Sequence, residues 1–184
     1  LTCESCHGKR FKKEVLEVKF NEVSIAALLD MTVDDAIAFF EKYEQIKIIQ
    51  RLQPLSDVGL GYVTLGQSSA TLSGGEAQRI KLASFISQGV TKEKVFFIFD
   101  EPTTGLHFHD INKLMDAFNA LIDRGHSILV VEHNLDLIKC ADYLIDLGPE
   151  AGDKGGHLVG QGTPEAIALI KNSHTGNYLR EKLK

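Results

Sequence analysis

The sequence predicts an α/β chain built on a parallel sheet, with a small, mostly helical part on the N-terminal side. The strongest observation is a run of five apolar residues, Val95 to Phe99, which is closed by Asp100 and Glu101. A second apolar run, Ile128 to Val131, follows a segment with helical periodicity. Short runs of this kind are typical of strands that a parallel sheet buries on both faces. Their alternation with helices predicts the fold class.

The first quarter of the chain predicts the helical part. Residues 16–20 alternate apolar and charged side chains, which predicts a short strand, and Asn21-Glu22 can turn it back. Thr32 and Asp35 have the spacing of a capping box, and apolar residues then recur at helical spacing toward Leu52.

Glycine, serine and threonine gather between Pro54 and Leu72, which favours a loop. We therefore expect residues 14–71 to form the helical subdomain and residues 72–184 to form the sheet-containing part.

The sheet-containing part has clear helix signals. Apolar residues between Ile111 and Ile122 lie at offsets of three, four and seven, and Gly125 can stop that helix. Asn134 can cap a helix over residues 135–141, in which Cys140 is expected to be a small core residue.

The C-terminal region predicts one more strand and helix. Residues 143–147 fit a strand, and Thr163-Pro164-Glu165 begins the penultimate helix with a cap and a proline at its first position.

Composition excludes several classes of protein. No uninterrupted apolar run exceeds five residues, far short of the roughly 18 that a membrane span requires. The 20 Lys plus Arg and 25 Asp plus Glu give a formal net charge of −5, so any nucleic-acid contact needs a local basic patch. Three cysteines are too few for a disulfide scaffold and no signal peptide opens the chain, so we expect a reducing cytoplasm.

The string from Leu72 to Arg79 predicts an anion-binding helix start. Ser73 and Glu76 have capping-box spacing, and Gly74 and Gly75 let a phosphate approach bare backbone amides at the positive end of a helix dipole. The spacing alone fits an ordinary capped helix equally well.

The carboxylates after the first strand predict a second functional position. Ligands of open α/β sheets bind at the carboxyl edge of the strands. Asp100 can hold Mg²⁺ there, usually through water, while Glu101 orients or deprotonates a water that attacks a γ-phosphate. His133, after the next strand, can reach the same edge. The alternatives are a solvated strand end and a structural histidine.

These strings, in this order, resemble the ATP-binding cassette ATPases, a class of P-loop NTPases. Within them the chain is similar to the carboxyl-terminal ATPase module of the UvrA family, the damage-recognition ATPases of bacterial nucleotide excision repair. In transporter ATPases the loop after the carboxylates usually ends in Asp, whereas this chain has His107, as in the UvrA-like loop. The resemblance rests on residues 57–62 (DVGLGY), 72–83, 100–107 (DEPTTGLH), 132–136 (EHNLD) and 145–149 (IDLGP).

The resemblance implies a partial ATPase sheet, with ATP, Mg²⁺ and Zn²⁺ as cofactors of the whole protein. It implies Glu101 and His133 as catalytic residues and Asp100 as the Mg²⁺ ligand, while Ser73, Gly74, Gly75 and Glu76 meet the ATP held by the other module. The implied partners are damaged DNA, the other ATPase module of the same polypeptide, a UvrB-type repair helicase and a second copy of the protein, with no membrane.

Cys3 and Cys6 resemble the second half of the family's four-cysteine zinc module, so residues 1–13 are expected to carry half a zinc site. A redox dithiol is the alternative, although the thioredoxin-like βαβ setting is lacking. Next to the pair lies the densest basic patch, which either contacts DNA phosphates or is a solvated charge run; it consists of Lys9, Arg10, Lys12 and Lys13.

The 184 residues contain no G-x-x-x-x-G-K-[ST] loop, which a cassette ATPase needs to cradle the phosphates. We therefore expect the chain to be the distal part of a module and to be inactive alone. Two other functions remain open. The first is an ATPase subunit of a membrane transporter, for which Asp at position 107 and no zinc module are expected. The second is a non-catalytic binding module, for which DNA or a protein is the only ligand.

Overall fold

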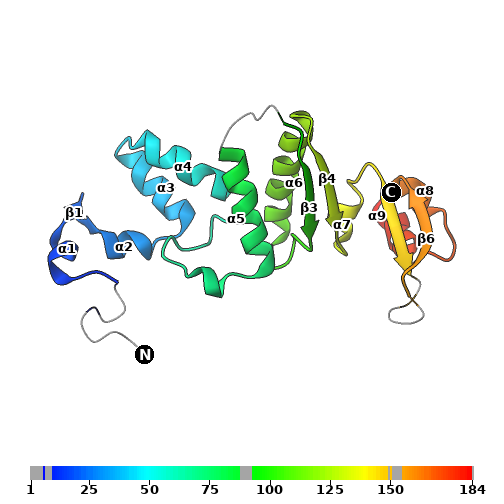
Figure 1. Ribbon diagram of the computed structural model, residues 1–184, viewed down its shortest axis with the longest axis horizontal. Coiled ribbons are helices and arrows are strands. Elements are labelled where there is room, and N and C mark those ends of the chain that lie inside the picture. The colour runs from blue at the N-terminus through cyan, green and yellow to red at the C-terminus, as the bar shows by residue number, and fades with distance from the viewer. Residues whose placement is uncertain (1–5, 7–9, 88–92, 149, 151–154, 184) are drawn as a thin grey trace. The chain divides into compact units, whose positions relative to one another are not determined.

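The computed structural model describes residues 6, 10–87, 93–148, 150 and 155–183 (Figure 1). Its internal contacts divide the chain into two units. The first unit is Leu1–Phe97 with Thr104–Ile128, and the second is Ile98–Thr103 with Leu129–Lys184. No helix in the described part is long and apolar enough to cross a bilayer.

The first unit begins with short elements. Helix α1 (Lys13–Glu17) precedes an antiparallel pair of two-residue strands, β1 (Lys19–Phe20) and β2 (Val23–Ser24), and helix α2 (Ile25–Leu29) follows. The turn at Asn21-Glu22 is confirmed, and both residues have positive φ, 47° and 66°. The strand predicted over residues 16–20 is wrong in its first half, because five residues are too few for periodicity to separate a strand from a helix.

Two helices stand where the periodicity predicted one. Helix α3 (Val33–Lys42) is capped by Thr32, whose hydroxyl accepts the Asp35 amide as expected. The chain then breaks at Glu44, with φ at 55°, before helix α4 (Ile46–Asp57) begins. Pro54, at which the predicted loop begins, lies inside α4.

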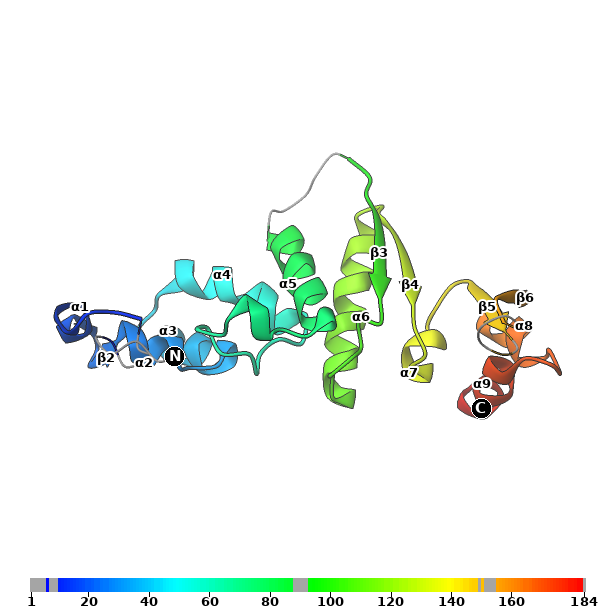
Figure 2. The same ribbon diagram turned by 60° about the horizontal axis from the view of Figure 1, so that its bottom comes forward.

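Helices α5 (Gly74–Ser87) and α6 (Phe108–Asp123) complete the first unit, after a short 3-10 turn η1 (Ser69–Thr71). Helix α4 packs against α3, α5 and α6, as Figure 2 lets the reader follow. The apolar spacing predicted for α6 is confirmed, since its inward residues are buried. The core of the unit includes Ala36, Phe40, Val58, Leu60, Leu82, Leu114, Phe118 and Leu121.

Strands β3 (Phe96–Asp100) and β4 (Ser127–Val131) pair side by side, which confirms the predicted parallel sheet (Figure 1). Backbone hydrogen bonds fix both ends of the pair. The Ser127 amide donates to the Val95 carbonyl at 3.0 Å, and the Glu101 amide donates to the Val131 carbonyl at 2.8 Å. This register brings the ends of both strands, and the turns that follow them, to one edge.

The predicted burial on both faces is wrong for β3 and also for β4, in which Leu129 is 41% exposed and Val131 is 55% exposed. Phe97 packs edge-on against Phe85 of α5, with ring centroids 4.8 Å apart, and Phe99 is buried. On the other face Phe96 is 61% exposed and Ile98 is 64% exposed. The five apolar residues therefore alternate between a covered and an open face, as strand geometry requires when one face has a neighbour.

The second unit continues beyond β4. Asn134 caps helix α7 (Leu135–Ile138), accepting the Asp136 amide, as predicted. Cys140 is exposed, so its predicted place in the core is wrong: α7 ends before it and its thiol donates to the Asp136 carbonyl instead.

Strand β5 (Leu144–Gly148) pairs antiparallel with β6 (His157–Gly162), and helices α8 (Pro164–Ala168) and α9 (His174–Lys182) follow. Thr163 caps α8 and Pro164 takes its first position, as predicted. A small core joins α7, α8 and α9 through Ile138, Ile167, Ala168 and Leu179.

Candidate functional site

The turn at the start of α5, residues Ser73–Glu76, is here called the signature turn. The Ser73 amide donates to a Glu76 carboxylate oxygen at 2.7 Å, and the Glu76 amide donates to the Ser73 hydroxyl at 3.2 Å, so the predicted capping box is present. Ser73 is half-buried and Gly74 is exposed. Apart from its chain neighbours and the backbone of its own helix, no atom lies within 4 Å of a side chain built on Gly74, so an anion can approach the helix there. Gly75 is buried, so its predicted approach to a phosphate is wrong.

A hydrogen-bond network stands behind the signature turn. The Tyr62 hydroxyl donates to Glu76 at 2.7 Å, and the buried Arg79 guanidinium donates at 3.4 Å both to that hydroxyl and to the carbonyl of Thr104, in the loop after β3. Arg79 therefore joins α5 to that loop within the first unit.

The network shifts three pKa values. The Ser73 amide, and then the Tyr62 hydroxyl, hold the pKa of Glu76 below its usual value. Partial burial and the bond to Glu76 raise the pKa of Tyr62. Burial lowers the pKa of Arg79, against the opposing effect of Tyr62 and Glu76.

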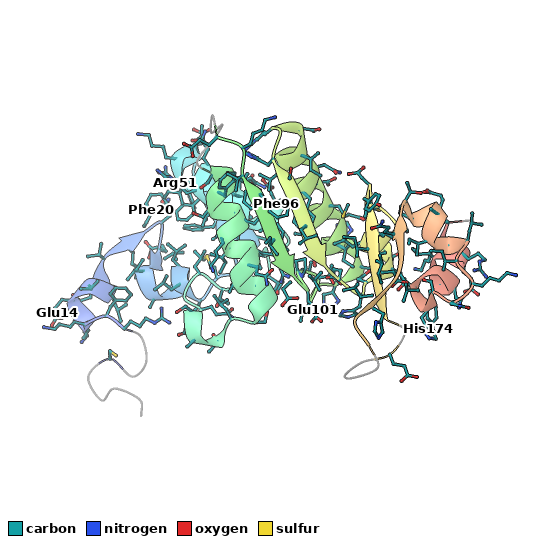
Figure 3. The ribbon with its side chains drawn as sticks, turned by 45° about the vertical axis from the view of Figure 1, so that its right-hand side comes forward. Glu14, Phe20, Arg51, Phe96, Glu101 and His174 are labelled. Atoms are coloured by element: carbon teal, nitrogen blue, oxygen red, sulfur yellow. The ribbon has the colours of Figure 1, made fainter. Side chains whose placement is uncertain are left out.

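The predicted Mg²⁺ ligand, Asp100, and the predicted catalytic carboxylate, Glu101, lie at the end of β3. Asp100 is the last residue of the strand and Glu101 follows it, at the end opposite Phe96 (Figure 3). Glu101 has a φ of 46°, which is uncommon for a residue with a side chain. Its carboxylate lies 3.7 Å from Nδ1 of His133, and both side chains are open to solvent, at 56% and 76% exposed. The structure thus brings Glu101 and His133 together, as predicted.

Beneath this pair lies a buried carboxylate that the sequence analysis did not select. The side chain of Glu132 is 2% exposed. One oxygen accepts the Thr103 amide at 2.9 Å and, in a short hydrogen bond, the Thr103 hydroxyl. The other accepts the amides of His133 at 2.8 Å and Asn134 at 2.9 Å. Burial acts to raise the pKa of Glu132, but these hydrogen bonds outweigh it and hold the pKa below its usual value.

The residues that sequence reasoning missed are Tyr62, Arg79, Thr103 and Glu132. All four stand inside the strings that carried the family resemblance, but none was given a role there. A carboxylate immediately after an apolar strand, close to several backbone amides of a turn, was the available signal for Glu132.

The N-terminal predictions are only partly within the described residues. Cys3 and Lys9 lie outside them, and Cys6 is half-buried. Arg10 donates to the Gly66 carbonyl, while Lys12 and Lys13 are exposed. Across the described ranges, no three His, Cys, Asp or Glu side chains gather closely enough to hold a metal ion.

A zinc measurement tests the half-site directly. We expect metal analysis of the purified 184-residue chain to find well under one tightly bound zinc per chain, because a structural zinc site requires four ligands and Cys3 and Cys6 supply two. A stoichiometric site in the monomer would contradict this. Binding of one zinc by two chains would instead show that copies pool their cysteines.

Comparisons with known proteins give one consistent result, although no family model matches the chain. UvrABC system protein A of Clostridium perfringens is 56% identical over 98% of this chain, and that of Aquifex aeolicus is 54% identical over all of it. The chain covers 19% and 20% of these proteins. The crystal structure of UvrA2 from Deinococcus radiodurans matches 99% of the chain with a TM-score of 0.82 and 42% identity, over 22% of that protein. In sequence and in fold, this chain is therefore a relative of one segment of UvrABC system protein A, about a fifth of that protein's length.

Proposed function

We propose that this chain is the distal part of the carboxyl-terminal ATPase module of a protein that recognises damaged DNA in nucleotide excision repair. The observation that carries the proposal is the pairing of Glu101 with His133 at the end of a parallel two-stranded sheet, at 3.7 Å. Identity above 50% to UvrABC system protein A over the whole chain supports it.

Two parts of the chain would serve two different ATP sites. The signature turn would contact the γ-phosphate of the ATP that the other module holds, through the exposed Gly74 and the amides at the start of α5. The Glu76 carboxylate accepts hydrogen bonds from the Ser73 amide and the Tyr62 hydroxyl. These bonds support the proposal, because they partly compensate the negative charge that would otherwise repel the phosphate.

The end of β3 would serve the chain's own module. Glu101 would orient the attacking water and accept its proton as the bond between the γ-phosphorus and the leaving oxygen of ADP breaks. His133 would donate a hydrogen bond to the γ-phosphate. Asp100 is an exposed residue whose carboxylate is the kind of ligand that a hard cation takes. Mg²⁺ held by it, usually through water, would neutralise charge on the phosphates.

The partners follow from the same proposal. The cationic side chains of Arg10, Lys12 and Lys13, with Lys9, would contact DNA phosphates beside a zinc module completed by cysteines beyond this pair. The other ATPase module, a second copy and a UvrB-type helicase would be the protein partners, and the domain limits at residues 13 and 71 remain predictions.

ATP hydrolysis tests the proposal. A full-length protein that contains this chain is expected to hydrolyse ATP with Mg²⁺, whereas the 184-residue chain is not, because it contains no G-x-x-x-x-G-K-[ST] loop to hold the phosphates. The measurement is phosphate release by both proteins under the same conditions. Magnesium-dependent turnover by the 184-residue chain, abolished by Glu101→Gln, would overturn the view that it is incomplete.

A further inference from the structure

The two side chains proposed to act on ATP are not held in place by packing. Glu101 and His133 are both more than half exposed, so their side chains are free to leave the spacing of 3.7 Å unless their backbones are fixed. Glu101 also has a left-handed backbone, which the surrounding structure must maintain. Contacts of other residues must therefore fix the backbones of the two turns that carry Glu101 and His133, and so set the distance between them.

Glu132 is in the position to do this. It follows β4, and its two carboxylate oxygens face two different segments: one oxygen accepts from Thr103, two residues after Glu101, and the other from His133 and Asn134. With its carboxylate 2% exposed, water does not compete for these bonds.

The arrangement suits an anion and no close substitute. All four contacts donate to the carboxylate, and three of them are backbone amides that can only donate. A carboxamide cannot satisfy them all, because its NH₂ group would have to face at least one backbone N–H. Hydrogen bonds to an ionised acceptor are also roughly twice as strong as neutral ones.

We propose that Glu132 is a positioning residue for ATP hydrolysis, which links the turn after β3 to the turn after β4 and so sets the spacing of Glu101 and His133. The proposal rests on the proposed function. It differs from a purely local role, in which Glu132 only caps the turn into α7, because it requires the bonds to Thr103 to matter for His133.

The first experiment uses the 184-residue chain and needs no nucleotide. Amide hydrogen exchange of His133 and Asn134 is measured in the wild type, Glu132→Gln, Thr103→Val and Thr103→Ser. Glu132→Gln is expected to speed exchange by about tenfold or more, the effect of losing hydrogen bonds to a charged group. Thr103→Val, which removes only the hydroxyl on the far side of the carboxylate, is expected to speed it by about 2-fold to 10-fold. Thr103→Ser restores the hydroxyl and is expected to restore protection.

The second experiment measures ATP turnover in a full-length protein that contains this chain. Glu132→Gln is expected to lower kcat by about 10-fold to 100-fold, as a misplaced catalytic group does, with little change in KM for ATP. Thr103→Val is expected to lower kcat less, and Thr103→Ser to match the wild type. Glu165→Gln is the control, because the pKa of Glu165 is also held low by hydrogen bonds but it lies at the start of α8.

The outcomes separate the two claims. A full-length wild type without turnover refutes the proposed function, while the exchange data still decide whether Glu132 links the turns. Wild-type kcat in Glu132→Gln, or exchange at His133 and Asn134 that does not respond to Thr103→Val, overturns the positioning role. A fall in thermal stability with unchanged kcat also overturns it, since it leaves Glu132 only a structural role.

Discussion

Replacing Glu101 by Gln is expected to slow ATP hydrolysis by about 10²-fold to 10⁴-fold in a full-length protein that contains this chain, while ATP binding is retained. The amide has nearly the same size as the carboxylate but cannot accept the proton of the attacking water. The Glu101 side chain is 56% exposed, so the substitution disturbs little packing. Single-turnover phosphate release, with nucleotide binding measured separately, checks both parts of the expectation.

Glu44→Gln is a matched control for this substitution. Glu44 is also exposed and also has a positive φ, 55° against 46° for Glu101, but it lies between α3 and α4. The two variants therefore share the loss of one negative charge at a left-handed position. Unchanged turnover in Glu101→Gln would remove Glu101 from the catalytic role, and equal slowing in Glu44→Gln would attribute the effect to charge or backbone alone.

The sequence predicted those parts of the fold that depend on near neighbours. Helix α6 and strand β4 follow from apolar spacing within a few residues, and the caps by Thr32, Asn134 and Thr163 follow from side chains that accept a backbone amide two or three positions on. Burial is different. The apolar character of Phe96 and Ile98 does not say whether another element covers them, and that depends on the whole sheet.

The same distinction holds for the candidate site. The capping box of the signature turn joins residues three positions apart, and the sequence shows it directly. Glu132 meets Thr103 across 29 positions and Arg79 meets Thr104 across 25, so no local pattern records either contact. The strings that resemble a known family contained Glu132 and Arg79, but their geometry came only from the fold.

Arg79→Ala is expected to lower the free energy of unfolding of the first unit by about 2–4 kcal/mol. The Arg79 side chain is fully buried, so truncation leaves a void in the packing around α5 and removes the hydrogen bonds to Tyr62 and Thr104. Hydrogen exchange of the α5 amides and the thermal transition of the 184-residue chain measure the change. Arg79→Lys keeps the charge but not the planar fork, so an intermediate loss is expected.

Arg51→Ala is the control, because Arg51 lies on the exposed surface of α4 in the same unit (Figure 3). Surface substitutions of this kind change stability by about 0.5 kcal/mol or less. If both alanine variants exchange and melt alike, Arg79 does not join α5 to the loop after β3. The two substitutions delete the same atoms, one set from a buried site and the other from an exposed site. The difference between their losses of unfolding free energy therefore isolates what the buried guanidinium contributes to holding α5 against that loop.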